Sequence, residues 1–457
     1  MKSRLIKNHN FNFIEIELVP ILQKEKSFFF GKVLAKDLLH IYTVRPAKYD
    51  SKKHSSFAKS FEDDKEYYEY LVKQDEERIA IKDFQREPDK SRINKIAKFL
   101  EDEEFPFFPN TIIATCDLIN DIQEFGISFD STFEQFIQIS NRPAHLSFLK
   151  KQGDDKYILY IPFVEHSVLV IDGQHRLKGL ETATAIIQEN FELLISFIIG
   201  FDRSVIAQLF YTINYEQKSV NKSLLYHLTG EFSSELDELT FMHNVVKILN
   251  ELENSPFHGK IKMLGINPKE ATSEMKEKLT ISQAFLIDYL IRTISATSIN
   301  SYSQPIFLYY YKNKELQIEI IRFLIRYFNA IREIKKNDWD NPSTNILTKG
   351  IGIAALIKVL HFLFVKMFID EWDTDPLKLA SVSKEDLIKK LDGLLDVDFS
   401  KEGEFGGAAS GGSINKLSQR IIEKVKYFSF NNYKEFFENY KSVYLPEFKE
   451  WIKNKIS

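Results

Sequence analysis

An aliphatic run that leads directly into a polar cluster is the feature that most constrains the fold of this sequence. The segment VLVIDGQHRLKGL places four consecutive aliphatic residues before the polar residues 172–176. The aliphatic run predicts a buried strand, and the residues from Arg176 to Glu189 have helical spacing. A buried strand that turns at a glycine into a helix predicts an α/β fold for this part of the chain.

Such a turn suits an anionic ligand. Gly173 lets the backbone approach a ligand closely, and the first N–H groups of the helix point outward at the positive end of its dipole. Arg176 adds a planar charged donor, His175 adds a further donor, and Asp172 adds a carboxylate that can hold Mg²⁺. We therefore predict a phosphate site, with a nucleotide as its natural ligand. The candidate catalytic residues are Asp172, His175 and Arg176, the candidate nucleotide contacts include Gly173 and Gln174, and Asp172 is also the candidate metal ligand.

The same residues also suit a turn without a ligand. In that alternative, Asp172 caps the helix, Gly173 makes the turn and Arg176 pairs with a surface carboxylate. The spacing alone does not separate the two interpretations.

The length and composition predict two folded domains. A chain of 457 residues is long for a single core, and 39 Phe with 20 Tyr indicate an aromatic-rich interior. Strand-like segments become rare after residue 235, so we predict an α/β domain at residues 1–235 and a mainly helical domain at residues 236–457. A formal net charge of -4 neither supports nor excludes binding to DNA.

The location expected from the sequence is the cytoplasm. The single cysteine, Cys116, cannot form an internal disulfide, and the first residues lack the apolar core of a secretory signal. The longest apolar stretch, residues 351–369, is about as long as a membrane span, but Lys358, His361 and Lys366 interrupt it. We predict a buried helix there, and no membrane contact.

Local patterns predict several further elements. Ile14, Ile16 and Leu18 alternate with glutamates as in a half-buried strand, and a helix with apolar residues from Ile93 to Leu100 follows a cap at Asp89 or Ser91. The charged residues 51–70 predict a surface loop that gives way to a helix. Further strands are expected at residues 111–116 and 191–200, and an antiparallel hairpin is expected from residues 157–164 and 167–171.

The polar cluster also carries a family resemblance. The segment IDGQHRLKGL resembles the signature of the DGQHR-domain family, which includes DndB-like proteins associated with DNA phosphorothioation and relatives in deazaguanine DNA-modification clusters. Three further segments agree with the family pattern in the same order: FQR at residues 84–86, the helix and strand at residues 92–114, and LFYTINYEQKSVNKSL at residues 209–224. The resemblance covers roughly residues 19–228, and LTKGIGIAAL echoes it more weakly.

This family in turn resembles the ParB/sulfiredoxin superfamily, whose Gly-x-x-Arg turn binds nucleotide phosphates. That motif maps onto Gly173 and Arg176, which implies a ParB/sulfiredoxin-like fold for the first domain. Gln174 stands where the sulfiredoxin motif has its catalytic cysteine, and an amide cannot act as the sulfur nucleophile. Sulfinic-acid reductase chemistry is therefore excluded, whereas phosphate binding is not.

A polar stripe supplies further candidate contacts to the nucleotide. Four residues of the segment 212–224 share one face if that segment is helical, and Gln85 with Arg86 are expected to join them over the ligand. The four are Asn214, Gln217, Lys218 and Asn221. An ordinary solvated helix face is the alternative.

The C-terminal half holds a candidate DNA contact. Four glycines precede a predicted helix on which Lys416, Arg420 and Lys424 recur every four residues, an arrangement that can grip nucleic-acid phosphates. The alternative is a flexible linker before a solvated helix. The segment lacks the residues of a Walker A loop. The sequence has no closely spaced pair of histidines or cysteines, so it does not predict a structural zinc site.

Two hypotheses for the function follow from the residues and the resemblance. In the first, the protein binds and hydrolyses a nucleoside triphosphate, ATP or CTP, with Mg²⁺, and acts with DNA in a DNA-modification or phage-defence system. In the second, it is a non-catalytic DNA-binding regulator of a phosphorothioation operon. A third alternative is a scaffold for partner proteins, including other DNA-modification proteins or further copies of the chain.

Overall fold

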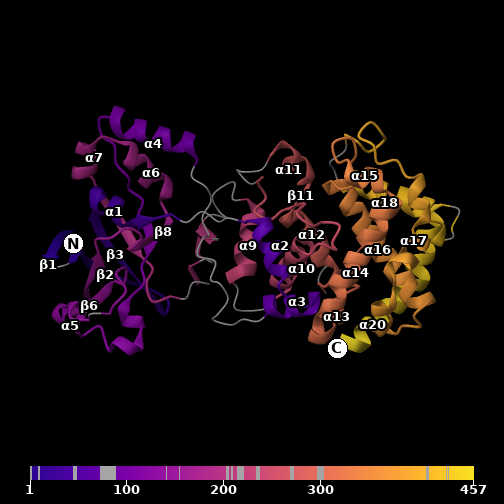
Figure 1. Cartoon of the computed structure of the whole chain (residues 1–457), viewed down its shortest axis with the longest axis horizontal. Coiled ribbons are helices and arrows are strands. Elements are labelled where there is room, and N and C mark those ends of the chain that lie inside the picture. The colour runs from indigo at the N-terminus through magenta and orange to yellow at the C-terminus, as the bar shows by residue number, and fades with distance from the viewer. Residues whose placement is uncertain are drawn as a thin grey trace. The chain divides into compact units, whose positions relative to one another are not determined.

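The chain forms two compact units, which are coloured by residue number in Figure 1. The first unit comprises residues 1–47 and 81–220, and the second comprises residues 48–80 and 221–457. The computed structural model describes residues 3–8, 11–44, 49–72, 89–139, 141–153, 155–201, 205–206, 209–210, 212–213, 221–232, 237–267, 272–295, 303–407, 411–428, 430 and 432–456. The fold is mixed α/β, with a sheet in the first unit and mainly helices in the second.

This division differs from a single boundary at residue 235. Residues 48–80 return to the helical unit, because their helices α2 (Ser51–Ala58) and α3 (Asp64–Val72) pack on its helix α10 (Glu238–Glu251). Tyr67, Tyr68 and Leu71 are buried in the core of that unit. A charged surface loop was predicted over the first of these helices. That prediction was wrong, because the Asp50 side chain accepts the N–H groups of Lys52 and Lys53 and starts α2.

The first unit is built on a nine-stranded mixed sheet among the described residues, with the order β4-β8-β5-β9-β3-β2-β7-β6 and with β1 paired to β2. Most neighbouring pairs are antiparallel, whereas β4 with β8 and β5 with β9 are parallel. The strands are β1 Ser3–Asn8, β2 Phe11–Gln23, β3 Lys26–Leu34, β4 Tyr42–Thr43, β5 Ile112–Thr115, β6 Phe148–Gly153, β7 Lys156–Pro162, β8 Val168–Asp172 and β9 Glu192–Phe197.

Several of these strands confirm their sequence patterns. In β2, Ile14, Ile16 and Leu18 are buried, as the alternation with glutamates predicts. The strands β5, β8 and β9 lie where apolar runs predict them.

The predicted hairpin of β7 with β8 was wrong. The strand β7 pairs with β2 and β6, whereas β8 pairs with β4 and β5. Each run is apolar enough to lie inside a sheet with neighbours on both sides, and such a run does not indicate which strands these neighbours are.

Five α-helices accompany this sheet in the described residues. They are α1 Ala35–Ile41, α4 Lys90–Asp102, α5 Phe133–Ile137, α6 Gln174–Thr182 and α7 Ala185–Asn190. Short 3₁₀ turns lie at Ile119–Asp121 and Gln123–Phe125. The helix α4 packs closely on α6, because Gly179 has no Cβ: one built there would lie 2.4 Å from the Ile96 side chain. This contact sets the middle of α4 beside the C-terminal half of α6.

The second unit is a helical assembly around an aromatic-rich core. Besides α2, α3 and α10, its helices are α9 Lys222–Phe232, α11 Ser273–Lys278, α12 Gln283–Leu290, α13 Leu308–Lys312, α14 Gln317–Ile334, α15 Lys336–Asp340, α16 Gly350–Asp370, α17 Lys384–Lys390, α18 Gly411–Lys424, α19 Tyr433–Asn439 and α20 Leu445–Ile456. A π-helical turn, Tyr440–Tyr444, joins the last two, and β10 (Ile261–Lys262) pairs with β11 (Ile281–Ser282). Short 3₁₀ turns lie at Ile291–Thr293, Lys314–Leu316, Pro376–Ser381, Asp392–Asp396 and Lys426–Phe428.

The long apolar helix predicted near residue 360 is α16. Within the described residues, α16 is the one helix that is long and apolar enough to cross a membrane, and 89% of its most apolar stretch is buried inside the protein. This burial fits the prediction of a core helix.

Candidate functional site

The turn between β8 and α6 is held in a conformation that requires glycine. Gly173 has φ +103°, and its carbonyl accepts the N–H groups of Arg176 and Leu177 at 3.0 and 3.1 Å. A Cβ at this position would lie 2.5 Å from Cδ1 of Ile112. The first helical residues, Gln174 and His175, have no acceptor for their N–H groups within the helix itself.

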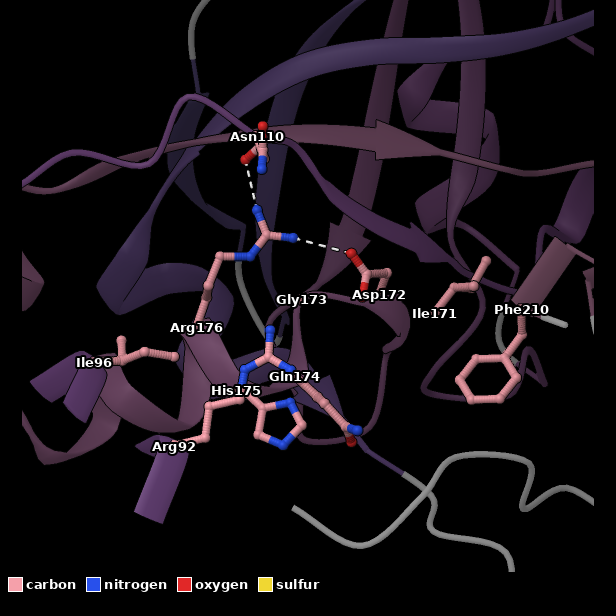
Figure 2. A pocket seen from close by; sticks show the side chains of 10 residues that line it. All are labelled: Arg92, Ile96, Asn110, Ile171, Asp172, Gly173, Gln174, His175, Arg176 and Phe210. Carbon is pink, nitrogen blue, oxygen red and sulfur yellow. Dashed lines mark hydrogen bonds and ion pairs between the residues drawn. The ribbon is translucent and has the colours of Figure 1, made fainter. Parts of the chain in front are cut away.

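A hollow opens at this turn. It has a volume of about 210 Å³, and it is lined by backbone and side chains from β8, α6, α4 and the segment before β5 (Figure 2). The lining residues are Arg92, Ile96, Asn110, Ile171, Asp172, Gly173, Gln174, His175, Arg176 and Phe210. The predicted turn therefore borders a space that can admit a small ligand.

The guanidinium of Arg176 is bound to the protein itself. Its Nη1 donates to the carbonyl of Asn110 at 2.7 Å, and its Nη2 donates to Oδ2 of Asp172 at 3.1 Å (Figure 2). Its Nη2 also donates to the carbonyl of Thr111 at 2.9 Å. Burial lowers the pKa of Arg176, and the nearby Asp172 carboxylate opposes that shift. Arg176 therefore ties the segment before β5 to the turn.

His175 connects the turn to α4. The backbone N–H of Asp89 donates to Nε2 of the buried His175 ring at 3.1 Å, so the proton of the neutral ring lies on Nδ1. The carboxylate of Asp89 in turn accepts the N–H groups of Ser91 and Arg92 and caps α4, as predicted. These two backbone donors lower the pKa of Asp89. The contacts place the first turn of α4 beside the first turn of α6.

Arg92 is the basic residue of this hollow that the sequence analysis missed. It is exposed, lies in the first turn of α4, and extends toward the β8–α6 turn (Figure 2). Among the described residues, its guanidinium has no hydrogen-bond or ion-pair partner. The available signal was its position three residues after the Asp89 cap, since a residue there lies next to whatever contacts the start of the helix.

Gln174 adds a polar group to the hollow. It is buried, and in the described part of the chain its Oε1 atom has no hydrogen-bond partner. The hollow thus combines an unpaired carboxamide oxygen, a charged guanidinium and the start of a helix.

A comparison with protein families decides the affiliation of the chain. The model of the family DndB, described as DNA-sulfur modification-associated, matches residues 65–405. The chain belongs to the DndB family. No curated protein and no solved structure matches it.

The family assignment confirms the resemblance carried by residues 172–176. The match spans residues of both units, and it associates this DndB-family protein with DNA-sulfur modification. The roles of Asp172, His175 and Arg176 in catalysis, and of Asp172 in metal binding, stay predictions.

The remaining residues predicted to contact the nucleotide are not assembled at this hollow by the described structure. Gln85, Arg86, Asn214, Gln217 and Lys218 lie outside the described residues. Asn221 belongs to the second unit of this DndB-family chain, where its Oδ1 atom accepts the N–H of Ser223 at 3.0 Å at the start of α9.

The basic residues proposed to contact DNA lie on α18, which confirms the predicted helix. Lys416, Arg420 and Lys424 are exposed on it. Arg420 forms ion pairs with Glu404 at 3.5 Å and Glu423 at 3.4 Å. In the described part of the chain, Lys416 and Lys424 have no such carboxylate. A contact with DNA stays a prediction.

Cys116 does not offer a reactive thiol. It is buried, and burial raises the pKa of its thiol to about 12. A thiol with that pKa is protonated near neutral pH and is a poor nucleophile.

Proposed function

We propose that the first unit binds the phosphate of a nucleotide at the β8–α6 turn, and that the protein uses this binding in a DNA-sulfur modification system. One observation carries the proposal: the hollow joins the start of α6 to the unpaired guanidinium of Arg92. The first N–H groups of a helix and the positive end of its dipole favour an anion, and an arginine fork matches phosphate oxygens. A ParB/sulfiredoxin-like use of Gly173 and Arg176 is part of this proposal.

The size of the hollow suits part of a nucleotide. Small-molecule pockets usually have volumes of about 300–1,000 Å³, whereas the described residues enclose about 210 Å³. We therefore assign the hollow to a phosphate group. The base and sugar need further residues, for which Gln85, Arg86, Asn214, Gln217 and Lys218 stay the candidates.

The contacts favour binding over hydrolysis as the primary activity. The Nε2 atom of His175 already accepts a backbone N–H, and Arg176 already donates to three oxygens. Oδ2 of Asp172 accepts one of these bonds, so a Mg²⁺ ion at this carboxylate would share it with Arg176. A group with satisfied hydrogen bonds holds the turn in place, whereas a general base needs a free acceptor atom.

Calorimetric titration of the whole protein tests the binding. ATP, CTP, GTP and inorganic phosphate are titrated in turn with Mg²⁺ into the wild type, Arg92→Gln and Lys95→Gln. We expect Arg92→Gln to weaken the binding of nucleotide by about tenfold or more, since a hydrogen bond to a charged group is worth about 1.5–3 kcal/mol. Lys95, exposed on the same helix but outside the hollow, is the matched control and should have no effect. Wild-type protein that binds none of these anions contradicts the proposal.

Phosphate release measures hydrolysis separately. We expect no turnover above background with ATP, CTP or GTP, with or without DNA. Turnover that disappears in Asp172→Ala would instead restore the catalytic role predicted for this carboxylate.

We propose a contact between α18 and DNA as a second function. Lys416 and Lys424 lie two turns apart on the exposed face of α18, and no described carboxylate neutralises them. Such lysines bind phosphates of DNA without reading the base sequence. This contact fits the regulator hypothesis, which does not require turnover of a nucleotide.

A further inference from the structure

A second polar cluster lies inside the helical unit and has no part in the proposed phosphate site. His227 and Glu231 stand one turn apart on α9, and His243 faces them from α10. Each residue offers one ligand atom, and the three atoms lie within 4.8 Å of one another. His227 and His243 are buried, and the Glu231 side chain is 9% exposed.

The spacing of this cluster is close to that of a metal site. The Nε2 atom of His243 lies 3.1 Å from Oε1 of Glu231, whereas ligand atoms around tetrahedral Zn²⁺ lie about 3.3 Å apart for bonds of roughly 2.0 Å. Gly230 makes this approach possible, because a Cβ there would lie 2.2 Å from the His243 ring. Two imidazoles and one carboxylate form a set of ligands that zinc commonly takes.

His227 is the member of the cluster whose buried ring nitrogen lacks a hydrogen-bond partner in the described part of the chain. Its side chain is 1% exposed, and its Nδ1 atom has no hydrogen-bond partner among the described residues. A neutral imidazole carries a lone pair on one ring nitrogen, which can bind a metal ion. A buried polar atom without a partner is destabilising, and a bound cation would remove that penalty.

Gln283 is placed to orient His243 as a metal ligand. Its Nε2 atom lies 2.5 Å from Nδ1 of His243, and its Oε1 atom has no partner in the described part of the chain. If the carboxamide of Gln283 rotates by a half turn, its Oε1 atom accepts a hydrogen bond from the N–H at Nδ1 of His243. The lone pair on Nε2 of His243 then points toward the carboxylate of Glu231. A cation between these two acceptor atoms would remove their repulsion. Histidine ligands of metals usually donate their second N–H in this way.

Lys247 accounts for the charge of the cluster in the metal-free protein. Its Nζ lies 2.5 Å from Oε1 of Glu231, and its side chain is 7% exposed. Glu251, one turn further along α10, lies within electrostatic range of Lys247 and accepts a hydrogen bond from Tyr49 at 2.6 Å. Lys247 therefore has a second carboxylate available when a metal ion takes Glu231.

We propose that His227, Glu231 and His243 bind a divalent transition-metal ion of the zinc type, which joins α9 to α10 and replaces the ammonium group of Lys247 at Glu231. Mg²⁺ and Ca²⁺ prefer oxygen ligands throughout, so this site differs chemically from the Mg²⁺ expected with a nucleotide. The proposal is independent of the proposed function.

Metal content after reconstitution tests the site. The whole protein is stripped with a chelator, incubated with Zn²⁺, separated from free metal by gel filtration and analysed by mass spectrometry. We expect one tightly held ion per chain in the wild type and a loss of that ion in His227→Gln and Glu231→Gln. His361→Gln is the matched control, since His361 is a buried histidine of the same unit that accepts a hydrogen bond from the N–H of Gln304. It should retain the ion.

Co²⁺ supplies a measurement that does not depend on the variants. In the stripped wild-type protein, Co²⁺ at this site should give the visible absorption bands of a low-coordinate nitrogen and oxygen environment, and Zn²⁺ should abolish them. Circular dichroism verifies that each variant folds. A wild type that gains neither the ion nor the bands overturns the proposal, and so does a folded His227→Gln variant that binds Zn²⁺ as the wild type does.

Discussion

At the scale of single residues, Gly173 separates two reasons for which a turn needs glycine. Gly126 and Gly173 both have positive φ, +60° and +103°, and both lie in the first unit. A Cβ at Gly126 would meet nothing within 4 Å, whereas a Cβ at Gly173 would meet the side chains of Ile112 and Arg176 at 2.5 and 3.1 Å. Gly126 is needed only for its positive φ. Gly173 is needed for its positive φ and also because a side chain there would overlap its neighbours.

Replacement by alanine should expose this difference. We expect Gly126→Ala to destabilise the first unit by about 1 kcal/mol through its backbone alone. Gly173→Ala adds an overlap in a packed region, so we expect about 2–4 kcal/mol. The thiol of the buried Cys116 reports the unfolding of this unit when its labelling is followed in increasing denaturant. Equal losses in both variants would show that Ile112 moves aside freely.

The residues of the β8–α6 turn also show what the sequence predicts at the scale of single residues. The identity and order of residues 172–176 predicted the turn, the helix and the family. They did not predict that the guanidinium of Arg176 donates hydrogen bonds to the carbonyls of Asn110 and Thr111. Those carbonyls lie more than 60 positions away in the chain, and a hydrogen bond over such a separation leaves no local sequence pattern. Arg92 was missed because its place at the hollow depends on how α4 packs beside α6, which its position after the Asp89 cap does not fix by itself.

At the scale of elements, periodicity predicted which segments are helices or strands better than it predicted their partners. The helix α4 has its cap at Asp89, one of the two predicted caps, and the structure adds that it packs against α6. The strands β7 and β8 were found but wrongly paired, because burial on both faces removes the alternation that indicates a partner. Sequence spacing did not predict the His227 cluster, because its two histidines and one glutamate come from two helices and form no close pair of histidines or cysteines.

The helix α18 provides a prediction at this scale. Binding of double-stranded DNA should weaken with salt, and the slope of log Kobs against log[salt] has a magnitude of about 0.9 for each phosphate that the protein neutralises. We expect Lys416→Gln and Lys424→Gln each to reduce the magnitude of the slope by about one. Arg420→Gln should reduce it less, since Glu404 and Glu423 already neutralise this guanidinium.

An exposed lysine elsewhere in the second unit serves as the control for this titration. Lys434, on α19, is exposed and has no carboxylate partner among the described residues. If Lys434→Gln changes the slope as much as Lys416→Gln, the interaction with DNA is not specific to α18. If the wild type does not bind DNA at low salt, the regulator hypothesis fails.

At the scale of the whole molecule, each unit carries its own spectroscopic or chemical reporter. The three tryptophans, Trp339, Trp372 and Trp451, all belong to the second unit, and the single cysteine belongs to the first. Trp339 and Trp372 are 1% and 4% exposed, and Cys116 is 8% exposed, so each signal changes when its own core opens. Two units with separate cores need not unfold in one transition.

These reporters test the phosphate site and the metal site independently in one protein. A ligand stabilises the unit that it binds by RT ln(1 + [L]/Kd), which is about 2.7 kcal/mol at 100 times Kd. We expect ATP with Mg²⁺ to raise the denaturant midpoint for labelling of Cys116 and to leave the tryptophan fluorescence transition unchanged. Zn²⁺ should raise the denaturant midpoint of the tryptophan fluorescence transition and leave the midpoint for labelling of Cys116 unchanged. If each ligand moves both transitions equally, the two units unfold as one, and neither site can then be assigned to its unit by this measurement. If Zn²⁺ moves only the Cys116 transition, the His227 cluster is not where the metal binds.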